Sequence, residues 1–216
     1  METGKLKKYF DKYFKWVAVF LFVLLFFYLC IELTENELSD FDFFVYNSVA
    51  QFISPNMTKI FRFITRFGSL EVILPLCILV LLFLRNKNKI ILMIVNMLSI
   101  VTINQGLKML FARPRPAVVR LAEASGFSFP SGHTMCSLAF YGFLLYLLLK
   151  SDYTPVLKWI GSICICFLIF FIGISRIYLG VHYCTDVVAG FSISIAYLII
   201  FTDIVNKIVY KNNKMN

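Results

Sequence analysis

Six apolar runs, separated by short polar segments, constrain the fold of this chain more than any other feature. They are residues 13–33, 70–84, 90–107, 134–149, 156–174 and 183–202. A helix crosses the hydrocarbon core of a bilayer with about 20 mostly apolar residues. Only 15% of the residues are charged, whereas ordinary soluble domains carry about 25%. The runs therefore predict an all-α polytopic membrane protein with six transmembrane helices in a single domain, residues 1–216.

The connection between the first two runs, residues 34–69, is long and has its own pattern. Apolar side chains recur at helical spacing over residues 41–53 and again over 55–67. We expect two short amphipathic helices that lie in the outer membrane interface. The alternative is a shallow or failed span, which Pro55 and the basic residues of the second stretch disfavour.

The net charge of +9 raises the possibility of a nucleic-acid partner, but its distribution points elsewhere. Lys and Arg cluster in residues 5–15, 85–89, 150–158 and 207–214. With a cytoplasmic N-terminus, all four clusters lie inside the cell, as the positive-inside rule requires. The remaining segments then carry as many acids as bases. The charge predicts both termini in the cytoplasm and no nucleic-acid binding, and the first run is expected to be an uncleaved anchor because no small-residue cleavage site follows it.

Three polar motifs lie at the predicted extracytoplasmic ends of the spans. They are Lys108-x4-Arg113-Pro114, Pro130-Ser131-Gly132-His133, and Ser175-Arg176-x5-His182-x3-Asp186. Polar groups at membrane depth are costly, so they are candidates for function by default. The predicted topology brings all three motifs to one face of the membrane, where we expect the active site.

The residue types in these motifs indicate phosphoryl transfer. His182 and Asp186 are four residues apart and share a helix face. A carboxylate on one ring nitrogen fixes the tautomer and makes the other nitrogen nucleophilic, and His133 offers a second imidazole as proton donor. Groups suited to an anion complete the set: Lys108, Arg113, Arg176, Ser131 and Gly132. The combination predicts metal-independent transfer through a phosphohistidine.

Each motif alone has a simpler interpretation. His182 with Asp186 fits a structural or proton-relay pair, and Pro-Ser-Gly-His is an ordinary helix start. Arg113 and Arg115 fit interfacial anchors. The combination on one face outweighs these readings. Three residues between the first two motifs are expected to be solvated rather than to select a headgroup: Arg115, Arg120 and Glu123. Two others are expected to hold Lys108 in place: Asn104 and Gln105.

Together the motifs resemble the three-part signature of the type 2 phosphatidic acid phosphatase family, whose membrane members have six transmembrane helices. The resemblance implies that His182 attacks phosphorus, that Asp186 orients it, and that His133 protonates the leaving oxygen. It also implies a set of phosphate-binding residues: Lys108, Arg113, Ser131, Gly132 and Arg176. No metal or other cofactor is implied.

The implied partner is a lipid phosphate within the bilayer, of the phosphatidylglycerophosphate, phosphatidic acid or undecaprenyl pyrophosphate class. No oligomeric state is assigned. One alternative is a phosphotransferase that passes the phosphoryl group to a second lipid. Another is a proton-coupled transporter that relays protons through His182 and Asp186, although it leaves the cations without an anion. A zinc site built from the two histidines and Asp186 is disfavoured by the nearby cations.

Overall fold

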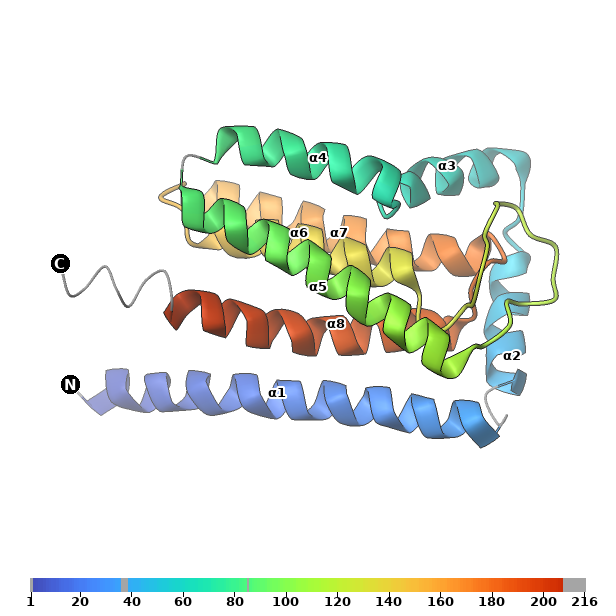
Figure 1. Ribbon diagram of the computed structural model, residues 1–216, viewed down its shortest axis with the longest axis horizontal. Helices are drawn as coiled ribbons and strands as arrows, with labels where there is room; N and C mark the ends of the chain where they lie inside the picture. Colours follow the sequence, from blue (N-terminus) through green and yellow to red (C-terminus); the bar gives the residue numbers. More distant parts are fainter. Residues whose placement is uncertain (1, 36–38, 85, 208–216) are drawn as a thin grey trace.

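The computed structural model describes residues 2–35, 39–84 and 86–207, and every regular element in these ranges is a helix (Figure 1). The helices are α1 (Glu2–Glu35), α2 (Ser39–Ala50), α3 (Pro55–Arg66), α4 (Leu70–Phe83), α5 (Lys87–Phe111), α6 (Gly132–Leu149), α7 (Pro155–Tyr178) and α8 (Cys184–Val205). The predicted all-α class is confirmed.

Five helices are individually long and apolar enough to span a bilayer: α1, α5, α6, α7 and α8. The second predicted span is different, because α4 has only 14 residues. It qualifies as a span only together with α3, from which it is bent by 47° at a short break. The described residues therefore contain six candidate spans if this bent pair counts as one. The interfacial placement of α2 and α3 remains a prediction.

Local sequence signals explain where several helices begin. Pro55 occupies the first turn of α3, and the Ser54 side chain accepts a hydrogen bond from the Met57 amide. Thr154 and Pro155 play the same two parts at the start of α7. A hydroxyl cap satisfies a backbone N–H that would otherwise be unpaired. Proline is tolerated in the first turn because no helical hydrogen bond there needs the N–H that proline lacks.

Helix α6 lies at the centre of the bundle and packs against α4, α5, α7 and α8. Its Phe140 and Phe143 are fully buried, together with Ile73 of α4, Met93 of α5 and Ile172 of α7. In contrast, α1 packs mainly along α8 and leaves most of its apolar side chains exposed. An exposed apolar face of this kind suits contact with lipid.

The two ends of the bundle differ in character (Figure 1). At one end the start of α1 lies beside the end of α8, where Lys15 and Asp203 form an ion pair. At the other end α2 crosses the bundle next to the loop of residues 112–131. Three basic residues used in the topology prediction lie outside the described residues: Arg85, Lys211 and Lys214.

Candidate active site

The three polar motifs meet at the end of the bundle that carries α2 (Figure 1). The end of α5, the start of α6 and the α7–α8 junction surround a cavity of about 550 Å³. The residues that line it include polar or glycine positions of the motifs and a residue that adjoins them: Lys108, Arg115, Gly132, His133, Arg176 and His182. The fold thus brings both histidines and three cationic side chains to one cavity.

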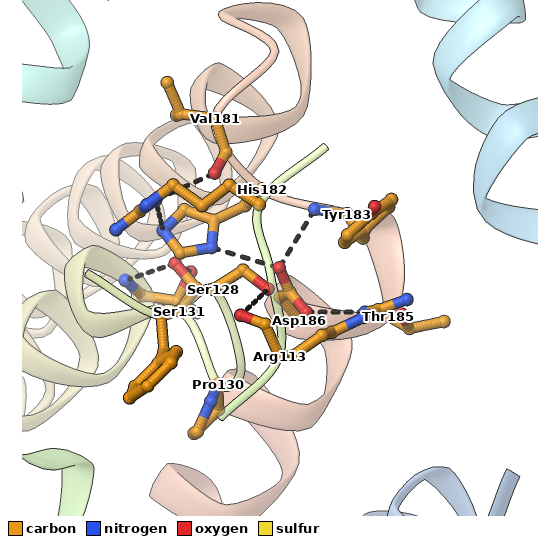
Figure 2. Close-up of polar contacts among 12 residues, drawn as sticks. Arg113, Ser128, Pro130, Ser131, Val181, His182, Tyr183, Thr185 and Asp186 are labelled. Atoms are coloured by element: carbon orange, nitrogen blue, oxygen red, sulfur yellow. Dashed lines mark hydrogen bonds and ion pairs between the residues drawn. The ribbon is translucent and has the colours of Figure 1, made fainter. Parts of the chain in front are cut away.

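His182 and Asp186 form a buried pair beside this cavity (Figure 2). Nδ1 of His182 is 3.1 Å from Oδ2 of Asp186, and the two side chains are 2% and 0% exposed. The same carboxylate oxygen accepts a hydrogen bond from the Tyr183 amide at 3.0 Å. An ionised Asp186 accepts a hydrogen bond from a protonated Nδ1, which leaves the free lone pair of the neutral ring on Nε2.

Burial, with smaller contributions from Arg176 and Arg115, lowers the pKa of His182 to about 4, against the opposing effect of Asp186. The imidazole is therefore neutral at pH 7, the state in which a ring nitrogen is nucleophilic. His182 lies in the short junction between α7 and α8 and lines the cavity together with Arg176 of α7.

His133 lies in the first turn of α6 and lines the same cavity as His182. Its ring packs closely against Gly68, at the break between α3 and α4. A Cβ atom at Gly68 would lie 3.2 Å from Cδ2 of His133 and 2.5 Å from Cγ2 of Ile172. A side chain at this position would clash with Ile172 and press on the imidazole, so glycine allows the break between α3 and α4 to approach the site closely.

Arg115 was expected to be solvated, but it lines the cavity. Its Nη1 lies 3.3 Å from Nε2 of His182 and donates to the Val181 carbonyl at 2.8 Å. Its other nitrogens donate to the Gly126 and Ser125 carbonyls. Burial lowers the pKa of Arg115, but a guanidinium remains charged in proteins. The guanidinium is therefore a cation held against the reactive side of the histidine ring.

Arg113, which the sequence placed among the phosphate-binding residues, occupies a different environment. Its Nη1 lies 2.6 Å from Oδ1 of Asp186 (Figure 2). Its Nη2 lies 2.8 Å from Oδ2 of Asp42. Its guanidinium also lies over the Tyr183 ring, 3.8 Å from the centroid. Arg113 does not line the cavity. Each of its two terminal nitrogens pairs with a carboxylate, and Nη1 also donates to the Thr185 hydroxyl at 2.8 Å, so Arg113 is a partner of Asp186.

Lys108 and Arg176 supply the other two cations. The ammonium of Lys108 donates to the Phe127 and Ser128 carbonyls. Nη1 of Arg176 donates to Oγ1 of Thr65 at 2.7 Å, while its buried Nε has no partner in the described part of the chain. An unpaired buried donor at a cavity wall is a costly feature unless a ligand accepts from it.

The Ser131-Gly132 pair forms the start of α6. The Ser131 hydroxyl caps the helix by accepting from Thr134, and the side chain is fully buried rather than part of the cavity wall. Gly132 does line the cavity, and a Cβ there would lie 2.9 Å from Oδ1 of Asn104. Asn104 also donates to the Pro130 carbonyl at 3.2 Å. Asn104 therefore contacts the start of α6. The Lys108 ammonium, which Asn104 was expected to hold, donates to backbone carbonyls instead.

Sequence reasoning missed two residues of the 34–69 connection. Asp42 of α2 binds Arg113 and Thr185, and Thr65 of α3 binds Arg176. Asp42 lies in the stretch 41–53 that was expected to form an amphipathic interfacial helix, yet its side chain is 1% exposed. Nothing in the local sequence distinguishes Asp42 from the nearby Asp40, which is exposed. The described residues contain no group of three or more His, Cys, Asp or Glu side chains arranged to hold a metal ion.

Comparison with known proteins places this site in a family context. The sequence pattern of the PAP2 superfamily matches residues 89–210. Phosphatidylglycerophosphatase B of Bacillus subtilis is 30% identical over 84% of this chain and 90% of its own length. Undecaprenyl-diphosphatase of Sulfolobus acidocaldarius is 25% identical over 83% of this chain and 85% of its own.

A solved structure shows the same architecture. The crystal structure of a transmembrane PAP2-type phosphatidylglycerolphosphate phosphatase from Bacillus subtilis superposes with a TM-score of 0.77. It is 30% identical in sequence, and the superposition covers 87% of this chain and 96% of that one. The similarity therefore extends from the motif region to most of the helical bundle.

Proposed function

Because this chain belongs to the PAP2 superfamily, we propose that it is a lipid phosphatase that hydrolyses phosphate monoesters or pyrophosphates on membrane lipids. The observation that carries the proposal is the shared cavity of His182, His133 and the three cations of Lys108, Arg115 and Arg176. The names of the relatives give the substrates to test first, namely phosphatidylglycerophosphate and undecaprenyl diphosphate.

The chemical step begins with attack of Nε2 of His182 on phosphorus. The bond from phosphorus to the lipid oxygen breaks, and His133 gives that oxygen a proton. The phosphoryl group is then bonded to His182 as a phosphohistidine. Water attacks the phosphorus next, His133 takes a proton from it, and the bond from Nε2 to phosphorus breaks to release inorganic phosphate. Asp186 stabilises the positive charge that the ring carries in the intermediate.

The three cations stabilise the negative charge of the transferred group. Arg115 and Arg176 offer planar forks, and Lys108 acts as a point charge. Backbone N–H groups at the start of α6 add the positive end of the helix dipole, near Gly132. In this scheme Arg115 takes the place first given to Arg113, because only Arg115 adjoins Nε2 of His182. Ser131 contributes by capping α6.

We place the site at the outer face of the membrane, on the strength of the distribution of Lys and Arg. The basic clusters lie in segments that alternate with the motifs along the chain. The exposed side chains of Met109, Leu110 and Phe127 adjoin the cavity end of α5 and suit contact with a lipid tail. A phosphate held at headgroup depth then meets the cations while its tail stays in the hydrocarbon.

Phosphate release by the purified protein in detergent tests this function. We expect release from phosphatidylglycerophosphate, phosphatidic acid or undecaprenyl diphosphate, with activity retained in excess EDTA and lost in His182→Gln. Loss of activity in EDTA would favour the zinc site. Transfer of labelled phosphate to a second lipid without free phosphate would establish the phosphotransferase instead. Absence of turnover on every lipid phosphate, with a folded protein, would contradict the proposal.

A further inference from the structure

Asp42 is a buried carboxylate for which the mechanism above has no use. It lies in α2, which crosses the cavity end of the bundle (Figure 1), and it is 1% exposed. Its Oδ1 accepts from the Thr185 amide at 2.9 Å, and its Oδ2 accepts from the Thr185 hydroxyl at 2.6 Å. Oδ2 also pairs with Nη2 of Arg113 at 2.8 Å. All of these contacts are to neighbours of Asp186.

These contacts complete an alternating row of charges that ends on the histidine ring. Asp42 pairs with Arg113, Arg113 pairs with Oδ1 of Asp186, and Oδ2 of Asp186 bonds to His182. All four side chains are buried, the most exposed being Arg113 at 9%. Charges in such surroundings interact more strongly than in water, and each member influences the next.

We propose that Asp42 is a positioning residue for the nucleophile, which rests on the proposed phosphatase function. Arg113 by itself would offset the negative charge of Asp186. Asp42 compensates Arg113 and holds its guanidinium in place, so that Asp186 keeps its full charge toward the His182 ring. That charge matters most when attack on phosphorus makes the ring cationic. Asp42 therefore acts on the reaction through Arg113 and Asp186, without contact with substrate.

Asp42→Asn tests the assignment because it removes the charge and preserves the size of the side chain. Asp40→Asn is the matched control, since Asp40 lies on the same helix, loses the same charge and is exposed. We expect kcat of Asp42→Asn to fall about 10- to 100-fold, as for other residues that orient a reactive ligand. KM should change by less than about threefold, because substrate contacts remain. Asp40→Asn should match the unaltered protein in both constants.

Imidazole ¹⁵N NMR tests the link from Asp42 to His182 by a measurement that does not depend on turnover. Asp42→Asn should shift the ring signals of His182 and leave those of His133 unchanged, while Asp40→Asn shifts neither. A kcat equal to that of Asp40→Asn, or an unchanged His182 signal in folded Asp42→Asn, would overturn the assignment. Failure of the phosphatase function is distinguishable, because the unaltered protein would then release no phosphate while the NMR comparison still tests the link from Asp42 to His182.

Discussion

Nη1 of Arg115 lies 3.3 Å from Nε2 of His182, whereas the opposite ring nitrogen of His182 lies 3.1 Å from Asp186. The ring is thus held between an anion on one side and a cation on the other. A phosphoryl group attacked by Nε2 meets the Arg115 guanidinium as its negative charge develops. The two arginines therefore lie on different sides of the ring. Arg115 lies beside Nε2 of His182, whereas Arg113 pairs with Asp186 beyond Nδ1.

Arg115→Ala should lower kcat/KM by about 10²- to 10³-fold, the usual effect of removing one preorganised donor from a transition state. Arg115→Lys should restore little of this loss, because an ammonium lacks the planar fork. Phosphate release at limiting substrate measures both. Arg120→Ala is the control, since Arg120 lies in the same loop and is exposed. Equal activity of Arg115→Ala and Arg120→Ala would exclude the role of Arg115.

His133→Gln should have an effect that depends on the leaving group. Lipid alkoxides leave poorly without a proton, so turnover of phosphatidic acid should fall by about 10²- to 10⁴-fold, the range of general acid catalysis. An aryl phosphate with a much more acidic leaving group needs less protonation, so phosphorylation of His182 by p-nitrophenyl phosphate should fall far less. Burst kinetics separate this step from hydrolysis. Equal losses with both substrates would contradict the assignment of His133 as the acid.

The His182 ring should remain neutral at pH values well below those at which a histidine is ordinarily protonated. Burial lowers its pKa to about 4, so its signal in ¹³Cε1 NMR should not titrate between pH 8 and pH 5. The chain has only two histidines, and His133→Gln assigns the remaining peak. Because the unfolded chain binds a proton near pH 6.5 and the folded one near pH 4, the free energy of unfolding should fall as the pH drops through this window. Titration near pH 6.5 would contradict the buried, neutral ring.

Ala112→Gly should stabilise the protein. Ala112 ends α5 with a φ of 44°, the left-handed region, and its amide donates to the Lys108 carbonyl. A side chain in this conformation costs about 1–2 kcal/mol, which glycine avoids. Part of this gain is lost because glycine is more flexible in the unfolded chain and loses more entropy on folding. We expect a gain of about 0.5–1 kcal/mol in the free energy of unfolding. Thermal unfolding in detergent measures it, with Gly126→Ala, also at positive φ, as the reverse substitution that should destabilise.

The helices could be predicted because apolar runs of span length leave the backbone few alternatives. The predicted runs 90–107 and 134–149 correspond to α5 and α6 within a few residues. The exception is residues 55–84, where α3 and α4 form a bent pair. A 14-residue helix is too short to span alone, and the sequence pattern of 55–67 does not reveal that it extends α4.

The meeting of the three motifs at one end of the bundle could be predicted from the order of the spans, but individual side-chain contacts could be predicted only between residues close in sequence. The spacing of His182 and Asp186 on one helix indicated their contact, which the structure contains. The segment Arg113-Pro114-Arg115-Pro116 has no periodicity, so nothing in it shows which arginine faces the cavity. Asp42 is equally hidden, because its partner Arg113 lies 71 residues away and the contact depends on how α2 crosses the bundle.

The most direct test of the account is to locate the phosphoryl group during turnover. The protein is mixed with ³²P-labelled phosphatidic acid, quenched within a turnover, and digested under alkaline conditions for peptide mapping. We predict an acid-labile, base-stable label on His182, stronger in His133→Gln with an aryl phosphate donor and absent in His182→Gln. A label on His133, or turnover of the unaltered protein with no labelled histidine at any quench time, would contradict the account.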